Sequence, residues 1–597
     1  MIVLLFWFVT FASFQTQIPI KSVERESTIH HSQLIIHNYP HDYFQSPVAG
    51  DIRLSGSFGE LRPNHFHAGI DIRHKEGRSG EPIFATADGF IGRIKIQVGG
   101  YGQAIYIIHP NGYTSVYGHL EKFTPAIQKF VRDKQYATQQ FEQDITLDSL
   151  QFKIRKGEQI ANMGNRGNSF GEHLHFEIRE TVSEKTINPL LFGIRLGDNT
   201  APTFGGAKIY EFEGDEINNE RSLSIKKTGN NFALVGFDTL EVSTEKVAFG
   251  INASDDSEGS NGHNGIYSLR VLIDSHLIYK FTAEAITFSE SRFVNAHMDY
   301  EEHATTARYY HRAFLLPGNY LSMYDTVVNR GIIAVSDKPT LVNIEVGDVN
   351  GNISRVKINL KRKLKERSGN FKSSPKVIQP LAQYFLPYNE GSLINFNNAQ
   401  LRFPVGCLYQ NLNLRLGSTD TENGQLSPTY QIHNTRTPLH SNMEIAILPT
   451  VSIPDSMRLK VFMAYCKNND SRISNLGGNF RSDGYFGCKN DYFGNYCLKY
   501  DVTPPTIKNI TSARTKKSRP SKLAFIIKDN FVAGGETALK YNATADGQFF
   551  LLEFDAKNNL LFYNFDENRV PSGEHVIVLT VTDYSGNVAT YKERVNF

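Results

Sequence analysis

Residues 171–177 read GEHLHFE, a stretch that places two histidines one residue apart with apolar residues between and after them. The continuation HLHFEIR alternates polar and apolar residues, which is typical of a β-strand. Residues i and i+2 of a strand point to the same face, so His173 and His175 are expected to project side by side. Such a pair can bind a metal or carry protons. The alternative is a half-exposed strand with two surface histidines.

Further imidazoles and one carboxylate stand upstream of this strand. HFHAGIDIRH contains His65, His67, Asp71 and His74, and YGHL contains His119. Imidazole nitrogens with a carboxylate oxygen are ligands that zinc prefers, and a catalytic zinc site has three protein ligands and an open position for water. Catalysis also requires a side chain beside the metal that acts as a general acid or base. The residues that supply both sets are His67, Asp71, His119, His173 and His175.

Short apolar strands separated by glycine-rich turns surround these residues and predict an antiparallel β-sheet domain over residues 46–196. An insertion over residues 121–155 interrupts the strands with a charged, helix-compatible segment. It either borders a groove at the site or forms a surface helix, and the sequence leaves both alternatives open.

Several blocks of this region resemble, in order, those of the LytM/lysostaphin-type zinc metallopeptidases, peptidase family M23. The blocks are SFGELRPNHFHAGIDI, GEPIFATADGFIGRI, GYTSVYGHL, RKGEQIANMGNRGNSFGEHLHFEIR and INPLLF. The resemblance covers about residues 50–193. It implies that Zn²⁺ is the cofactor and that His67, Asp71 and His175 are its ligands. It also implies that His119 and His173 flank the metal-bound water as catalytic acid or base, in an order that the sequence does not give.

The resemblance further implies an exported endopeptidase that hydrolyses peptide cross-links of bacterial peptidoglycan. Family members cleave beside glycine or D-alanine, and the sequence does not state the bond. The alternative is a non-catalytic LytM-like scaffold that activates a cell-wall amidase. Because three ligands complete a catalytic zinc site, His65 and His74 are expected to lie outside the ligand set.

The remainder of the chain predicts three more β-rich modules, so the whole protein is expected to be mostly β. GDNTAPTFGGAKIY and YDVTPPTIKNI each open a stretch that ends in a D-x-x-G-N turn, at Asp348 and Asp583. We interpret these stretches as divergent Ig-like β-sandwiches at residues 200–362 and 503–597. A further β-rich module at 376–500 holds Cys407, Cys466, Cys488 and Cys497. They form one or two disulfides or remain free thiols.

The sandwich modules are expected to act as spacers, or to bind glycan or cell-envelope proteins. The loop NASDDSEGSNGHNG at residues 252–265 gathers acidic and amide side chains, namely Asp255, Asp256, Glu258, Asn261 and Asn264. Its spacing fits no EF-hand. We therefore expect an ordinary solvated turn there rather than a calcium site.

Composition excludes several other classes of protein. The chain has 597 residues, 40% of them hydrophobic and 21% charged, and a formal net charge of +2, which gives no reason to expect nucleic-acid binding. Residues 1–19 carry an apolar run that suits a signal peptide and is too short to span a membrane. We expect no integral membrane segment in the mature chain, and a protein exported to the periplasm, the cell envelope or the outside of the cell.

Overall fold

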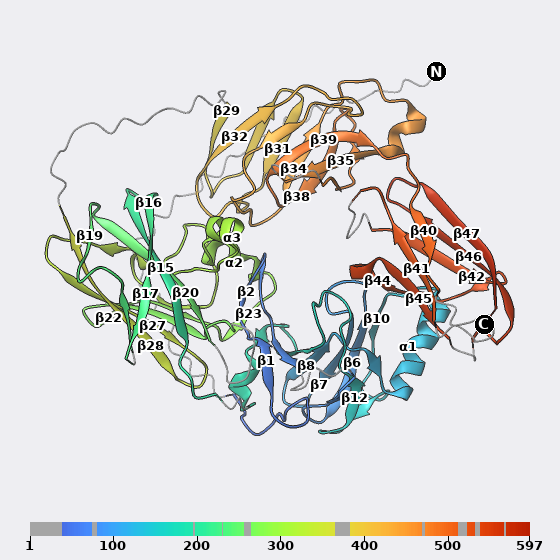
Figure 1. The fold of residues 1–597 in the computed structure, drawn as a ribbon, viewed down its shortest axis with the longest axis horizontal. Helices are drawn as coiled ribbons and strands as arrows, with labels where there is room; N and C mark the ends of the chain where they lie inside the picture. Colours follow the sequence, from blue (N-terminus) through green and yellow to red (C-terminus); the bar gives the residue numbers. More distant parts are fainter. Residues whose placement is uncertain are drawn as a thin grey trace, which may run out of the picture.

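The computed structural model describes residues 39–596 except 74–79, 195–197, 230, 256–263, 364–381, 468–471, 512–521, 532–537 and 566–568. Antiparallel sheets dominate the described residues, with three short α-helices among them (Figure 1). The mostly β, multi-module fold that the sequence predicts is therefore confirmed. The expected signal peptide and His74 lie outside the described residues.

The first module is built on one sheet whose main path has the order β1-β4-β13-β8-β7-β6-β10. These strands are β1 (Arg53–Gly56), β4 (Ile70–Arg73), β13 (Leu174–Glu180), β8 (Tyr113–Gly118), β7 (Gln103–Ile108), β6 (Gly89–Ile96) and β10 (Gln143–Thr146). β13 lies between β4 and β8, so both of its edges are hydrogen-bonded. Its register places His175 opposite Asp71 on one side and Gly118 on the other.

The alternation of β13 divides its side chains between two faces. Leu174, Phe176 and Ile178 are fully buried in the hydrophobic core, where the Phe176 ring lies 5.4 Å from that of Tyr117. The opposite face carries the polar side chains of the strand. The apolar residues of HLHFEIR thus fix which face the histidines occupy, because a one-residue slip would turn the core residues outward.

The second module packs directly on the first. β14 (Thr186–Ile187) of the first module pairs with β23 (Ala285–Ile286) of the second. The ring of Phe66 lies 6.4 Å from that of Phe281, and one continuous hydrophobic cluster includes buried residues from Phe44 to Tyr409. The two modules therefore share a core.

The third and fourth modules have separate cores. Described residues between 382 and 500 form two antiparallel sheets, and those between 506 and 596 form two more. Cys407, Cys488 and Cys497 carry free thiols, so the alternative of disulfides is not realised at these three positions.

The fourth module lies against the first, so the four modules follow one another around a circle (Figure 1). The contact involves α1 (Pro125–Thr138), which belongs to the insertion at 121–155. Arg132 of α1 forms an ion pair of 2.9 Å with Glu553, and the ring of Tyr136 lies 5.7 Å from that of Phe549. The insertion therefore provides a docking surface for the C-terminal module, a role that neither sequence alternative included.

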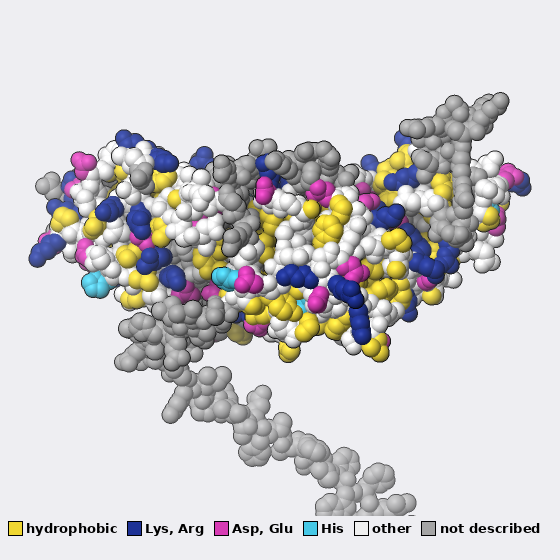
Figure 2. Space-filling model, turned by 90° about the horizontal axis from the view of Figure 1, so that it is seen from below, with side chains coloured by type: hydrophobic (Ala, Val, Ile, Leu, Met, Phe, Trp, Pro, Cys, Tyr) yellow, Lys and Arg dark blue, Asp and Glu magenta, His cyan; other side chains and the backbone are white. Residues whose placement is uncertain are grey.

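The surface carries both signs of charge. Figure 2 shows Lys and Arg side chains together with Asp and Glu along the whole length of one face, with hydrophobic side chains between them. Among the described residues, no helix combines the length and the hydropathy needed to cross a membrane.

Candidate metal centre

Three donor side chains come from two neighbouring strands and the turn before one of them. Asp71 lies in β4 and His175 lies opposite it in β13, whereas His67 immediately follows β3 (His65–Phe66). Gly69 separates His67 from Asp71, and a Cβ atom there would come within 2.4 Å of the Phe176 carbonyl oxygen. Only glycine therefore lets the chain approach β13 closely enough to bring the two ends of H-x-x-x-D onto His175.

The donor atoms form a nearly equilateral triangle. His67 Nε2, Asp71 Oδ1 and His175 Nδ1 are each 3.0 Å from the other two. All three side chains are buried. Ligand atoms about 2.0–2.2 Å from a tetrahedral metal lie about 3.3–3.6 Å apart, so a small outward shift of these three atoms would bring them to the spacing of metal ligands.

In His67 and His175, the hydrogen bond made by one ring nitrogen determines that the other nitrogen faces the centre. His67 Nδ1 is 2.8 Å from the Ser57 carbonyl oxygen, and His175 Nε2 is 2.8 Å from Glu177 Oε1. Because carbonyl and carboxylate oxygens only accept hydrogen bonds, these nitrogens donate, which leaves His67 Nε2 and His175 Nδ1 with free lone pairs in the neutral rings. Two lone pairs and a carboxylate oxygen then face one point, an arrangement that a bound cation stabilises.

The electrostatics of the metal-free site fit two of the three donors. Burial lowers the pKa of His67 to about 4, which keeps the ring neutral. Burial would raise the pKa of Asp71, but the neighbouring histidines outweigh it and hold that pKa well below its usual range. Asp71 is therefore an anion, as a metal-binding carboxylate must be. At the third donor, burial would lower the pKa of His175, but Asp71 and Glu177 raise it to about 9, so a metal ion must displace a proton from this ring.

Glu177 orients His175 and was not anticipated from the sequence. Its Oε1 accepts from the Tyr101 hydroxyl at 2.6 Å, and its Oε2 accepts from Arg179 Nε at 2.6 Å. Burial would raise the pKa of Glu177, but Arg179 and His175 lower it to about 2. The Tyr101 ring stacks on His175 with centroids 5.1 Å apart. The signal was present, because Glu177 is the next same-face residue after His175 in HLHFE.

His119 and His173 lie side by side next to the triangle. Their ring centroids are 4.7 Å apart, and His173 Nε2 is 3.4 Å from Asp71 Oδ1. His119 Nδ1 is 2.7 Å from the Arg166 carbonyl oxygen and His173 Nδ1 is 2.8 Å from that of Gly171. Both rings thus donate through Nδ1, and Nε2 of His173 faces the Asp71 carboxylate. Burial, with His175 and His173 nearby, lowers the pKa of His119 to about 3, so it stays neutral.

The remaining side chains of the first motif point elsewhere. His65 is exposed, and its Nδ1 is 2.9 Å from the Pro63 carbonyl oxygen. Asn64 donates to the Tyr492 hydroxyl at 2.6 Å and accepts from Asn295 at 3.0 Å, so it links the first module to the second and third. Within the described ranges, His67, Asp71 and His175 form the one donor group in this module that is spaced for a metal.

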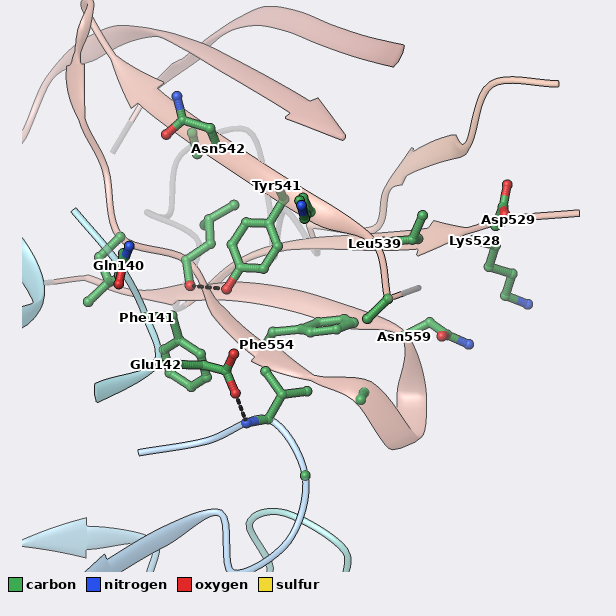
Figure 3. Close-up of a pocket in the computed structure, with 18 of the residues that line it drawn as sticks. Gln140, Phe141, Glu142, Lys528, Asp529, Leu539, Tyr541, Asn542, Phe554 and Asn559 are labelled. Atoms are coloured by element: carbon green, nitrogen blue, oxygen red, sulfur yellow. Dashed lines mark hydrogen bonds between the residues drawn. The ribbon is translucent and has the colours of Figure 1, made fainter. Parts of the chain in front are cut away.

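The fourth module forms a cleft with the loop that carries Arg166 and Phe170. A cavity of about 450 Å³, lined by Arg166 and Phe170, adjoins a larger one of about 1060 Å³ drawn in Figure 3. Phe141 of the insertion and Phe554 of the fourth module line both cavities. Lys557 Nζ donates to the Asn165 and Ser169 carbonyl oxygens at 2.5 and 3.1 Å. The fourth module therefore holds the loop whose Arg166 carbonyl positions His119, and Phe170 stays fully exposed at the rim.

Two family profiles match the chain. The profile of peptidase family M23 matches residues 65–154, and that of the Zu5-like domain matches residues 383–501. The first range contains His67, Asp71 and His119 and ends before β13, which completes the donor triangle.

Curated proteins of known sequence are similar over the first module. The DD-carboxypeptidase/endopeptidase Mpg of Neisseria meningitidis serogroup B is 33% identical over 143 residues, which are 23% of this chain and 26% of that protein. The lipoprotein NlpD of Yersinia enterocolitica is 34% identical over 116 residues, 19% of this chain and 93% of that sequence. The murein hydrolase activator NlpD of Escherichia coli K12 is 34% identical over 124 residues, 21% of this chain and 25% of that protein. The chain thus spans about a quarter of the length of the curated relatives that it matches first.

Solved structures match the same region with low overall superposition scores. The catalytic domain of lysostaphin from Staphylococcus simulans is 21% identical with a TM-score of 0.17, covering 24% of this chain and 91% of that one. The SpoIIQ–SpoIIIAH pore-forming complex contains a chain that is 18% identical with a TM-score of 0.20, covering 26% and 94%.

Proposed function

Because the chain belongs to peptidase family M23 through its first module, we propose that it is an exported zinc metalloendopeptidase that hydrolyses peptide cross-links of bacterial peptidoglycan. The observation that carries the proposal is the donor triangle of His67, Asp71 and His175, with two further histidines beside it. Two nitrogens and one carboxylate oxygen form the ligand set of catalytic zinc sites, which keep a fourth position for water.

A zinc ion held by these residues supplies a Lewis acid, which polarises a carbonyl group and lowers the pKa of its water to about 7. Ser57 and Glu177 fix the orientation of the two imidazoles through the hydrogen bonds of His67 and His175. Such outer partners keep the ligand rings in place when substrate enters.

His119 and His173 supply the proton chemistry in this proposal. Both donate through Nδ1 to backbone carbonyl oxygens, so Nε2 is the atom free to take a proton from water and to return it to the leaving amine. A protonated Nε2 also donates a hydrogen bond to the oxyanion that forms on the scissile carbonyl. Either ring is placed for each role.

The substrate class rests on the relatives and on the cleft. Mpg is named as a DD-carboxypeptidase/endopeptidase, which favours a cross-link that contains D-alanine. The cleft between the first and fourth modules has a volume of about 450 Å³, and its wall includes Arg166, whose carbonyl oxygen holds His119. A cross-linked peptide is long and flexible, so a two-sided cleft that restrains it places the scissile bond near the histidines.

A second candidate function is activation of a separate cell-wall hydrolase without catalysis. Similarity to the murein hydrolase activator of Escherichia coli favours it. Such a scaffold needs no metal ligands, whereas this chain keeps three converging donors and two flanking histidines. The catalytic proposal gives each of these five side chains a role, whereas a non-catalytic scaffold would require none of them.

The two functions are distinguished by assaying the purified full chain, loaded with zinc, on cross-linked muropeptides. We expect cleavage that stops when a chelator removes the metal and resumes when zinc is returned. A chain that binds zinc, cleaves no cross-linked muropeptide and stimulates a purified amidase on intact cell walls would establish the activator function instead.

A further inference from the structure

Three carboxylates meet where the third module joins the fourth. Asp501 follows β39 (Gly494–Tyr500), Asp529 follows β41 (Lys522–Lys528), and Asp583 follows β46 (Glu574–Thr582). One oxygen from each side chain lies within 4.8 Å of the others. The proposed peptidase chemistry uses none of these side chains.

Asp501 offers this group an oxygen that has no partner. The residue is only 1% exposed, and its Oδ1 accepts from Thr503 N at 3.3 Å and from Asn530 Nδ2 at 3.4 Å. Its Oδ2 is inaccessible to solvent and has no hydrogen-bond partner in the described part of the chain, and the same holds for Asp529 Oδ1. A buried carboxylate oxygen left without a partner costs free energy, so these oxygens indicate a missing ligand.

The three negative charges are not neutralised by side chains. No salt bridge involves any of them within the described ranges. Lys460 acts on Asp501 only through its charge, because its Nζ donates to the Ser585 carbonyl oxygen at 3.0 Å and to Asn587 Oδ1 at 2.6 Å. Burial, together with the charges of Asp501 and Asp583, raises the pKa of Asp529 to about 6. A cation at this point would remove the repulsion.

The same arrangement recurs where the first module joins the second. Asp198, Asp255 and Asp348 also place one oxygen each within 4.8 Å of the others. Asp198 precedes β15 (Thr203–Glu213), Asp255 follows β20 (Lys246–Ser254), and Asp348 follows β27 (Thr340–Gly347). These are the corresponding places in the second module. Asp255 belongs to the loop that was expected to be an ordinary turn, and Asp256, Glu258 and Asn261 of that loop lie outside the described residues.

The hydrogen bonds around both groups correspond as well. Asn352 N donates to Asp348 Oδ1 at 2.8 Å, and Asn587 N donates to Asp583 Oδ1 at 2.7 Å. Both are the D-x-x-G-N turns that the sequence repeats. Two modules with different sequences thus keep three carboxylates at equivalent positions, which a solvated turn does not require.

We propose that Asp501, Asp529 and Asp583 bind a calcium ion that fixes the fourth module to the third. Carboxylate oxygens are the ligands that hard cations prefer, and Ca²⁺ accepts about six to eight oxygen ligands at about 2.3–2.6 Å in a flexible geometry. Mg²⁺ requires a tighter octahedron with bonds of about 2.1 Å. Water and backbone carbonyl oxygens complete the calcium sphere.

The ion would stiffen a joint on which the peptidase cleft depends. Gly478 N of the third module donates to the Tyr584 hydroxyl at 3.3 Å, and Asn587 Nδ2 donates to the Asp501 carbonyl oxygen at 3.1 Å. The turn that carries Asp583 therefore contacts the module before it. Fixing this joint sets where Lys557 meets the loop at residues 165–170.

The test measures calcium bound to the full chain by equilibrium dialysis, in buffer that holds zinc at a fixed concentration. We expect Asp529→Asn to bind one calcium ion fewer per chain than the unchanged protein. Glu574→Gln, which removes an exposed charge from β46, is the matched control and keeps the full number. Equal binding by the Asp529→Asn variant and the unchanged protein would overturn the proposal.

Thermal unfolding provides a second readout that a folding defect does not imitate. Calcium should raise the Tm of the unchanged protein by more than that of Asp529→Asn, because an ion that binds only the folded state stabilises it and the variant binds one ion fewer. Without calcium the variant should unfold at the same or a higher temperature, since it lacks one of three mutually repelling charges. A variant that is less stable only without calcium, or an equal Tm rise with Mg²⁺ alone, would contradict the calcium assignment.

Discussion

At the scale of single residues, each histidine of the candidate centre makes a hydrogen bond through one ring nitrogen, and this bond fixes the orientation of the other nitrogen. His175 donates its second N–H to the Glu177 carboxylate, whereas His67, His119 and His173 donate theirs to backbone carbonyl oxygens. A carboxylate partner makes a ring a stronger ligand, and a neutral carbonyl leaves it a weaker base. This difference within HLH supports one ligand and one proton carrier.

The division of roles predicts distinct mutant phenotypes. Replacing His67, Asp71 or His175 by Ala removes a ligand, so zinc content should fall with activity. Replacing His119 or His173 by Ala should leave zinc largely bound and lower turnover by about 10²- to 10⁴-fold, the range for a general acid or base. The measurement is zinc per chain beside turnover of a purified cross-linked muropeptide. Loss of zinc in all five variants would require more than three protein ligands.

The orientation of His175 predicts a role for Glu177 that does not involve touching the metal. Glu177→Gln replaces an obligate acceptor with an amide that also donates, so His175 loses the partner that fixes its ring. Zinc affinity should fall about 10- to 100-fold, as measured by competition with a chelating dye. Glu180→Gln is the control, because Glu180 ends the same strand and is exposed. Unchanged affinity in Glu177→Gln would show that Tyr101 and Arg179 orient the ring without it.

At the scale of secondary structure, strand register and one inserted helix do most of the positioning. The register of β4 and β13 places Asp71 opposite His175, and α1 brings Glu553 of the fourth module against Arg132 and Arg166 at 2.9 and 3.3 Å. Arg166 also supplies the carbonyl that holds His119. The insertion thus connects the C-terminal module to a histidine of the site.

Breaking this connection should loosen the cleft without emptying the metal site. Glu553→Gln removes the anion that pairs with Arg132 and leaves Arg166 with Glu121 alone. Because both arginines are about one-fifth exposed, the cost should be about 1–3 kcal/mol, less than for a fully buried pair. Hydrogen exchange at residues 165–170 should speed up while zinc content stays constant. The exposed-charge variant Glu574→Gln should exchange as the unchanged protein does, and equal exchange in both variants would refute the coupling.

A buried histidine pair in the second module predicts acid sensitivity. His297 Nε2 lies 2.8 Å from His311 Nδ1, and both rings are fully enclosed. Burial lowers the pKa of His311 to about 4 and holds that of His297 well below its usual range. The unfolded chain, with a histidine pKa of about 6.5, binds more protons below that pH. Stability is therefore complete above about pH 6.5 and should fall as the pH drops toward 4.

The measurement is the Tm of the full chain between pH 7 and pH 4, at fixed zinc and calcium. His311→Gln should weaken the pH dependence of the transition that includes the second module. His276→Gln, which changes an exposed histidine at the start of β22 (His276–Thr282), should leave the slope unchanged. A slope that is the same for His311→Gln and the unchanged protein would show that other groups cause the acid sensitivity.

At the scale of the whole molecule, the modules are joined unequally. The first two share one hydrophobic cluster and a strand pairing, whereas the third and fourth have separate cores. Phe66, which precedes His67, is fully buried with its ring 5.7 Å from His297 and 6.4 Å from Phe281 of the second module. The support of the metal site therefore extends beyond the domain boundaries at residues 46–196, which remain a proposal.

This packing predicts which fragment is the smallest stable unit. Residues 39–362 keep the shared core and should bind about one zinc ion and unfold cooperatively. Residues 46–196 alone expose Phe66 and leave β14 without β23, so their Tm should be lower. Both fragments are compared by zinc content and thermal unfolding. If residues 46–196 match the longer fragment in zinc content and in Tm, the first module folds independently and the shared core does not stabilise it.

Local patterns in the sequence determined the mostly β fold and the ligand face. Strand alternation in HLHFEIR fixed which side chains enter the core, and it placed His173 and His175 together because the period of a strand is two residues. Only the tertiary structure brought Arg166, Lys557 and Glu553 to one cleft, and only it joined Asp501, Asp529 and Asp583. These contacts connect residues far apart in the chain, and their geometry depends on how whole modules pack, which no local periodicity encodes.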